Sequence, residues 1–206
     1  MRFHNPLTHI IDNQAKVICL RLLCKYPAAI SGRQLSKIVS INPTTVNKAL
    51  NSLIENQIIL VRKAGKSHLY ELNKTNWLVI NILVPMFNRE SMLLNDVMKY
   101  ISQRIKQSPI RKGIMSVVLY GSVHERNEEP TSDIDLFIVV KDAKYKKKAE
   151  DLIFGIDSDL MPRIGMGIEP YIKTKEGFKK DRELNVIKSI LKSNRLIWGQ
   201  NLEEVL

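Results

Sequence analysis

The 206-residue sequence has few cysteines and no long apolar runs. Its two cysteines, Cys19 and Cys24, cannot build a disulfide framework and lack the paired spacing of a zinc site, which favours a reducing, cytoplasmic setting. The longest apolar run, residues 77–86, is far shorter than the roughly 20 residues that span a bilayer. The first five residues, Arg2 and His4 among them, lead into no apolar run. We therefore expect no secretory leader and no membrane partner.

Acidic residues are scarce in the first part of the chain. Residues 1–85 contain 11 Lys or Arg and only 3 Asp or Glu, whereas residues 86–206 contain 21 and 18. The net charge of +11 therefore divides into +8 and +3, which predicts two domains. A basic first domain indicates contact with a polyanion, with a merely solubilising surface as the alternative. The content of 44% hydrophobic and 26% charged residues excludes global disorder.

The N-terminal part has the pattern of three short helices. Apolar residues recur at helical spacing over residues 10–26. Ser31 and Gln34 form a capping-box pattern that opens a second helix. A third helix begins at Pro43 after a break of three residues, and it keeps polar side chains on the face opposite its apolar stripe. Two short helices separated by such a turn are what a helix-turn-helix requires.

Two strand patterns, residues 58–61 and 68–72, follow the third helix and are joined by a basic turn over residues 62–67. Three helices and a hairpin with a basic tip resemble the winged helix-turn-helix family of bacterial transcription regulators, over about residues 10–72. The resemblance implies that the third helix enters the major groove of double-stranded DNA while cations of the wing lie along the backbone. The expected DNA contacts are Thr44, Thr45, Asn47, Lys48 and Asn51 on the helix, with Arg62, Lys63 and Lys66 on the turn.

A protein-docking module is the alternative reading of this domain. Because helix-turn-helix proteins commonly bind two half-sites as dimers, we expect a homodimer. Residues 75–108 are predicted to be mostly helical, with Pro85 and Pro109 as breaks. The apolar stripe of this segment predicts core packing, with a dimer contact as the alternative. The expected organisation is a DNA-binding domain over residues 1–74, a helical linker over 75–108 and a second domain over 109–206.

Two predicted strands in the second domain carry a pattern suited to phosphate chemistry. The strand over residues 116–120 ends at Gly121-Ser122, and the strand over residues 132–140 begins with Asp133 and Asp135. Residues two apart in a strand face the same side, where two carboxylates repel unless a cation lies between them. Mg²⁺ prefers such oxygen ligands and shares its shell with substrate phosphates. The glycine allows close backbone approach and the serine can hold a phosphate, which predicts nucleotidyl transfer.

Tyr120-Gly121-Ser122, ten intervening residues and Asp133-Ile134-Asp135 resemble the signature of the DNA polymerase β-like nucleotidyltransferase superfamily. The similarity covers about residues 91–199 and is greatest to the minimal nucleotidyltransferases of bacteria, in versions fused behind a winged helix. It implies that Gly121 and Ser122 hold the phosphates of a nucleoside triphosphate, and that Asp133 and Asp135 bind Mg²⁺. A third carboxylate on a later strand completes the family's two-metal site. Glu169 is the candidate here, with a simple surface charge as the alternative.

One segment departs from the family pattern. Members commonly carry a small residue, Arg and Gly shortly after the glycine-serine, where this chain has His124-Glu125-Arg126. An acidic side chain therefore enters where phosphate charge is expected, and Arg126, one position along, is the candidate nucleotide contact. The intact pair of aspartates favours an enzyme, whereas this departure favours a nucleotide sensor.

These observations predict an α+β protein, with an N-terminal winged helix-turn-helix and a small mixed-sheet nucleotidyltransferase domain. The first hypothesis is Mg²⁺-dependent transfer of a nucleoside monophosphate from a nucleoside triphosphate to a hydroxyl. A partner toxin is the favoured acceptor, because small members of the family often act as antitoxins that nucleotidylate a toxin. The alternative is a DNA-binding transcription regulator whose nucleotidyltransferase-like domain only senses nucleotide or dimerises.

Overall fold

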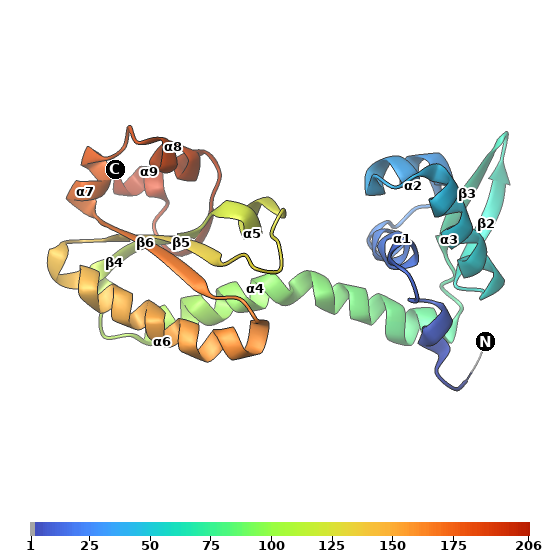
Figure 1. Cartoon of the computed structure of the whole chain (residues 1–206), viewed down its shortest axis with the longest axis horizontal. Coiled ribbons are helices and arrows are strands. Elements are labelled where there is room, and N and C mark those ends of the chain that lie inside the picture. Colours follow the sequence, from blue (N-terminus) through green and yellow to red (C-terminus); the bar gives the residue numbers. More distant parts are fainter. Residues whose placement is uncertain (1–2) are drawn as a thin grey trace. The chain divides into compact units, whose positions relative to one another are not determined.

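The computed structural model describes residues 3–206 (Figure 1). Met1 and Arg2, which belong to the segment considered above for a leader, lie outside the described residues. The chain divides into two compact units, Met1–Leu93 and Leu94–Leu206, and each has its own hydrophobic core. Within the described residues, no helix is both long enough and apolar enough to cross a bilayer.

In the described part of the first unit, three helices precede a β-hairpin (Figure 1). The elements are η1 (Pro6–His9), α1 (Gln14–Lys25), β1 (Ile30–Ser31), α2 (Gly32–Val39), α3 (Pro43–Glu55), β2 (Ile59–Ala64) and β3 (Ser67–Leu72). The strands form an antiparallel sheet in the order β1-β3-β2. This arrangement is the predicted winged helix-turn-helix.

Side-chain caps decide where these helices begin. The Asn13 side chain accepts a hydrogen bond from the backbone of the first turn, so α1 begins at Gln14 rather than at the predicted residue 10. Ser31 and Gln34 form the predicted capping box, in which Ser31 Oγ accepts from the Gln34 N–H at 3.3 Å. Each cap satisfies N–H groups that have no partner inside the helix. The turn between α2 and α3 has the predicted three residues.

The hairpin is longer than the sequence pattern predicts. β2 continues through Arg62 and Lys63, which pair with β3, so the predicted six-residue turn is reduced to Gly65 and Lys66. Gly65 has a φ of 60°, and a positive φ at this position matches the twist of two-residue hairpins. After Ile59 every residue of β2 is exposed. No alternation of apolar and polar side chains therefore marks the end of this strand in the sequence.

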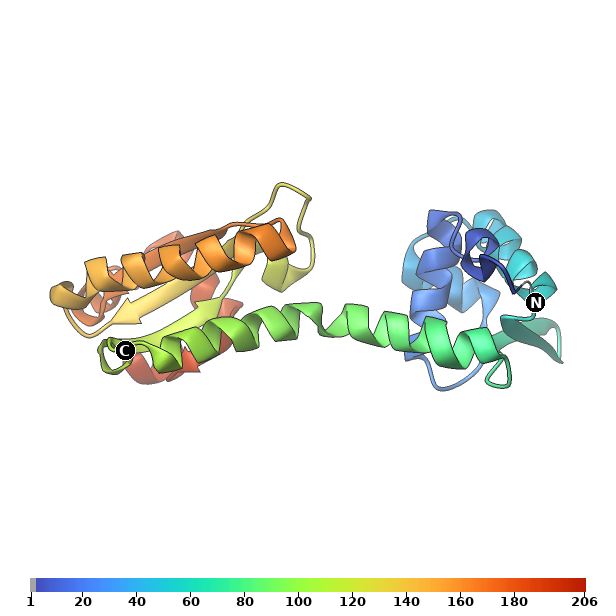
Figure 2. The same ribbon diagram turned by 90° about the horizontal axis from the view of Figure 1, so that it is seen from below.

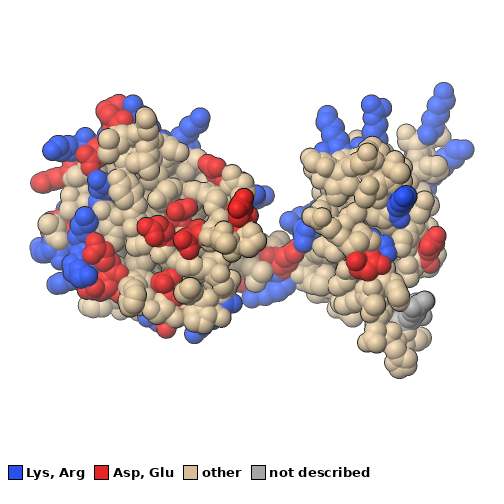
Figure 3. Space-filling view, viewed as in Figure 1, with Lys and Arg blue, Asp and Glu red and all other residues tan. Residues whose placement is uncertain are grey.

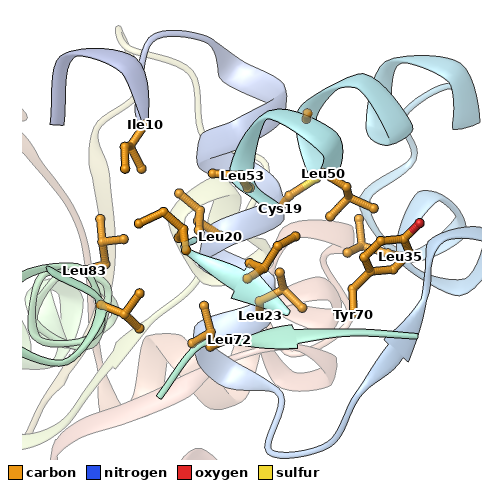
Figure 4. Close-up of a cluster of buried hydrophobic side chains, with 14 of the residues drawn as sticks. Ile10, Cys19, Leu20, Leu23, Leu35, Leu50, Leu53, Tyr70, Leu72 and Leu83 are labelled. Carbon is orange, nitrogen blue, oxygen red and sulfur yellow. The ribbon is translucent and has the colours of Figure 1, made fainter. Parts of the chain in front are cut away.

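The core of the first unit is built on leucines from α1 and α3 (Figure 4). Leu20, Leu50 and Leu53 have at most 1% of their surface exposed. Leu83 and Phe87, which follow the hairpin in the chain, complete this core. The segment that the sequence assigns to a linker therefore contributes to the packing of the first unit.

A π-helical turn, η2 (Val79–Leu83), leads into the long helix α4 (Val84–Gln107). The Val84 N–H donates to the carbonyl of Val79, five residues earlier. Pro85 has no N–H to donate to the preceding turn, and the wider π-turn just before it tolerates this missing hydrogen bond. The helix therefore continues through Pro85, where the sequence predicted a break.

The first part of α4 packs with the first unit and its last part packs with the second. Arg21 on α1 donates to both carboxylate oxygens of Glu90, at 2.6 and 2.7 Å. Both side chains are partly exposed, so this pair contributes at most about 1 kcal/mol to stability. Further along, Met98 is buried with the second core, whereas Met92 and Leu93 are 45% and 56% exposed. The predicted apolar stripe is therefore core packing only in its second half.

The second unit is built around a mixed four-stranded sheet in its described residues. The strands are β4 (Ile114–Leu119), β5 (Ile134–Val140), β6 (Ile168–Thr174) and β7 (Arg195–Gly199), in the order β6-β5-β4-β7. The helices are η3 (Arg111–Gly113), α5 (Gly121–Glu125), η4 (Ala143–Tyr145), α6 (Lys146–Ile164), α7 (Lys175–Lys180), α8 (Asn185–Lys192) and α9 (Leu202–Val205). β5 and β6 are parallel, and the other pairs are antiparallel.

Helices cover both faces of this sheet. Alternate residues of β5 point to opposite faces, so Leu136 packs with α4 and α6 on the face seen in Figure 2, and Phe137 packs with α7, α8 and α9. The Phe137 ring lies 5.4 Å from the rings of Tyr171 and Phe178. Leu184, in the turn between α7 and α8, is 48% exposed.

The packing predicts that the first unit depends on Leu50. The change Leu50→Ala removes a fully buried side chain, and we expect the free energy of unfolding to fall by about 2–5 kcal/mol. Leu60→Ala is the matched control, because Leu60 is 44% exposed and its loss should change stability by about 0.5 kcal/mol or less. Urea unfolding followed by circular dichroism measures both. Equal losses in the two variants would contradict the described core.

Candidate active site

The turn after β4 brings backbone against a carboxylate. Gly121 begins α5 and has a φ of 71°, a left-handed conformation that favours glycine. A Cβ built on Gly121 would collide with the Asp135 carboxylate. The Tyr120 N–H donates to the Asp135 carbonyl at 3.1 Å and fixes the turn beside β5. Any side chain at position 121 would therefore displace Asp135.

Asp133 lies just before β5 rather than inside it, because the strand begins at Ile134 and not at the predicted residue 132. The Ile134 N–H donates to the Gly167 carbonyl at 2.8 Å and holds the start of β5 next to the start of β6. Asp133 Oδ1 lies 2.8 Å from the position that a Cβ on Gly167 would take. Glycine at 167 thus leaves the space that the exposed Asp133 side chain occupies.

Glu169 enters the site from the neighbouring parallel strand. It is the register partner of Asp135, so the two lie side by side on β6 and β5. The pKa of Asp135 is raised, first by burial and then by the negative charges of Asp133 and Glu169. Burial, followed by the negative charges of Asp135 and Glu169, also raises the pKa of Tyr120 to about 12. The three carboxylates therefore form one electrostatic cluster, and Figure 3 shows acidic side chains gathered over this part of the unit.

The donor set of this cluster suits a hard divalent cation. Three carboxylates offer oxygen ligands, and their mutual repulsion is what a cation between them would relieve. Within the described residues, no group of three or more His, Cys, Asp or Glu side chains is already arranged as a set of metal ligands. The oxygen ligands of these residues fit Mg²⁺ by chemistry.

The predicted phosphate contacts occupy one short helix. Gly121 and Ser122 form the first turn of α5, and the Ser122 carbonyl accepts from the N–H groups of Arg126 and Asn127. Arg126 lies at the C-terminal end of α5, with a φ of 62° and an exposed side chain. The structure therefore places the glycine and serine beside the carboxylates and Arg126 at the opposite end of the helix.

The predicted DNA contacts are surface residues of the first unit. All are exposed: Thr44, Thr45, Asn47, Lys48 and Asn51 on α3, and Arg62, Lys63 and Lys66 on the hairpin. Asn47 Oδ1 also lies 3.3 Å from the position of a Cβ on Gly32, so this side chain approaches the start of α2. Figure 3 shows Lys and Arg side chains extending from this unit, with few acidic ones among them.

Two residues near the carboxylates were missed by the sequence reasoning. Gly167 makes room for Asp133, and a glycine near the start of the strand that carries Glu169 is the signal that could have found it. Asp157 on α6 accepts from the Ile168 N–H at 2.8 Å and caps the start of β6. No local pattern marks Asp157, because its role depends on how α6 packs against the sheet.

Three solved structures match parts of this chain at low similarity. A winged helix-turn-helix domain from Mycobacterium bovis, a homodimeric possible ArsR-family regulator, is 14% identical over 44% of this chain and 77% of its own, with a TM-score of 0.34. A toxin–antitoxin structure with AMP-PNP is 13% identical over 50% of this chain and 77% of its own, with a TM-score of 0.31. TrmBL2, an archaeal chromatin protein, is 12% identical over 90% of this chain and 72% of its own, with a TM-score of 0.29.

Sequence comparison adds a family match. No curated protein matches the chain. The family described as polymerase beta, nucleotidyltransferase matches residues 101–203, a region that contains the glycine-serine turn and all three carboxylates. Because this region is half of the chain, the protein belongs to the polymerase beta nucleotidyltransferase family.

Proposed function

We propose that this chain transfers a nucleoside monophosphate from a nucleoside triphosphate to a hydroxyl group and releases pyrophosphate. The observation that carries the proposal is the cluster of Asp133, Asp135 and Glu169 beside the Gly121-Ser122 turn, inside the region that matches the family. Such a cluster repels phosphate unless cations accompany it, so its chemistry is that of metal-assisted phosphoryl transfer.

The residues of the site divide into metal ligands and nucleotide contacts in this mechanism. Asp133, Asp135 and Glu169 would hold Mg²⁺, in the two-metal arrangement of the family. When bound, Mg²⁺ neutralises phosphate charge and lowers the pKa of the acceptor hydroxyl. Gly121 lets phosphate approach the backbone, and the Ser122 hydroxyl donates to a phosphate oxygen. Arg126 would contact the nucleotide from the end of α5.

The reaction would form a bond between the acceptor oxygen and the α-phosphorus. The bond from that phosphorus to the β-phosphate oxygen breaks, and pyrophosphate leaves. Glu169 would take the acceptor proton, and its exposure next to Asp135 supports this role. For the acceptor we propose a hydroxyl side chain of a partner toxin, on the basis of the resemblance to minimal nucleotidyltransferases.

For the first unit we propose binding of double-stranded DNA by a homodimer. Support comes from the exposed polar face of α3, the exposed cations of the hairpin and the net charge of +8 over residues 1–85. The major groove of B-form DNA admits a helix, whereas that of A-form RNA is too narrow. The wing would place Arg62, Lys63 and Lys66 along the phosphate backbone.

A nucleotide-sensing regulator is the second candidate. It is favoured by Glu125, which ends the short helix that begins at the phosphate turn and adds a negative charge close to where phosphate would bind. A sensor would bind a nucleoside triphosphate and Mg²⁺ without transferring any part of it. The same assay therefore separates the two candidates.

The proposed chemistry predicts that Asp133→Asn and Asp135→Asn each lower nucleotidyl transfer by about 100-fold or more, because each removes a charged oxygen ligand. The protein is incubated with each α-labelled nucleoside triphosphate and Mg²⁺, alone and with the product of its neighbouring gene. Chelation of Mg²⁺ with EDTA should have the same effect. Transfer of label to any acceptor is the measurement.

Glu203→Gln is the control for these variants, because Glu203 is an exposed carboxylate on α9. It should leave transfer unchanged. Nucleotide binding without transfer in the unaltered chain would establish the sensor instead. Full transfer by both aspartate variants would rule out the assigned site.

The wing predicts a salt-dependent affinity for DNA. Replacing Arg62, Lys63 and Lys66 together by Ala should weaken binding to a labelled duplex of mixed sequence. The slope of log affinity against log salt should become shallower by about 0.9 for each phosphate that the variant no longer neutralises. Lys74→Ala, an exposed cation beyond the hairpin, is the control. Fluorescence anisotropy at several salt concentrations measures both, and identical slopes would argue against the wing as a DNA-binding element.

A further inference from the structure

A groove of about 410 Å³ lies between α6 and β6, which forms one edge of the sheet. Its apolar lining consists of Ile153 and Phe154 on α6 with Ile168 and Pro170 on β6. Phe154 has 73% of its surface exposed, although it is large and apolar. An exposed aromatic side chain beside an apolar hollow is typical of a surface that contacts a partner.

The polar lining of the groove is mainly acidic. Glu150, Asp151 and Asp157 all come from α6. Lys147 is the single basic residue among the described residues of the lining, and its ammonium lies 3.4 Å from Asp151 and 3.9 Å from Glu150. The formal charge of the lining therefore stays at −2. Such a surface repels the phosphates of nucleic acid and favours a cationic partner.

One end of the groove lies next to the candidate active site. Asp157, which lines the groove, and Asp133, which belongs to the site, both approach Gly167. Their Oδ1 atoms lie 3.8 and 2.8 Å from the position of a Cβ on that glycine. A chain lying in the groove would therefore reach Asp133 at its end, whereas Asp135 and Glu169 project from the opposite face of the sheet.

The edge of β6 offers little backbone for an added strand at this end. The Ile168 N–H is already bonded to Asp157, and Pro170 has no N–H. A partner strand would find no donor at either position, which is a common protection of edge strands. Recognition here must therefore depend on side chains that fill the groove and meet its charges.

We propose that this groove binds the acceptor protein through a basic segment with a large apolar side chain. The apolar side chain would pack on Phe154, and the basic ones would meet Glu150 and Asp151. Beyond Asp133 the segment would pass the start of β6 to bring its hydroxyl to the other face of the sheet, where Asp135 and Glu169 lie. This inference rests on the proposed nucleotidyl transfer and selects a protein acceptor over a nucleic acid.

A synthetic peptide tests the groove without knowledge of the natural acceptor. The full chain, without nucleotide, is titrated with a fluorescent peptide that alternates arginine and leucine around a central tyrosine. We expect Phe154→Ala and Asp151→Lys each to weaken binding by about tenfold or more in fluorescence anisotropy. A peptide with glutamate in place of arginine should not bind.

Matched changes outside the groove serve as controls. Leu184→Ala removes another exposed apolar side chain of the same unit, and Glu203→Lys reverses another exposed carboxylate. Both should leave the affinity within about twofold of the unaltered chain. Equal weakening by groove and control variants, or unchanged affinity in the groove variants, would overturn the proposal. Sedimentation showing that Phe154→Ala abolishes self-association without affecting the peptide would assign the groove to a second copy of this chain instead.

The two proposals fail separately. Peptide binding is measured without nucleotide, so it remains informative when no transfer is detected. Transfer to an acceptor protein that Asp133→Asn abolishes and Phe154→Ala leaves intact would keep the enzyme and reject the docking groove. Loss of transfer in Phe154→Ala, with nucleotide binding retained, would support both.

Discussion

The repulsion among three carboxylates is the constraint on which the candidate site depends. Burial first, and then the negative charges of Asp133 and Glu169, raise the pKa of Asp135. Glycines at 121 and 167 leave the space for two of these side chains, and the parallel pairing of β5 with β6 places the third. A cation would convert this unfavourable arrangement into a binding site for phosphate. The acidic side chains of the groove between α6 and β6 extend this negative charge to one side of the site.

The two units divide the electrostatic character of the chain. The winged helix carries most of the positive charge, on side chains that are exposed on α3 and the hairpin. The nucleotidyltransferase unit is nearly balanced overall, and acidic side chains gather around its candidate site (Figure 3). The first unit therefore attracts negative charge, and the candidate site of the second attracts positive charge.

Local signals predicted the elements whose ends are fixed by nearby residues. The Ser31–Gln34 capping box and the three-residue turn before Pro43 required no knowledge of distant contacts. Local signals failed where the backbone geometry compensates for a residue or pattern that normally ends an element. The π-turn carries α4 past Pro85, and the exposed hairpin extends through Arg62 and Lys63. In both places the sequence has the pattern of an element end, because the side-chain pattern does not record the π-turn or the pairing of the two strands.

The sequence by itself determined the two folds, the family and the residue types at the candidate site, because glycine, serine and aspartate at fixed spacing carry their chemistry wherever they are placed. Only the tertiary structure decided that Glu169 lies beside Asp135, because that neighbour depends on the register between β5 and β6. It alone placed Asp157 next to Asp133 and opened a groove along α6. Such contacts join residues far apart in the chain, and no periodicity in the sequence records them.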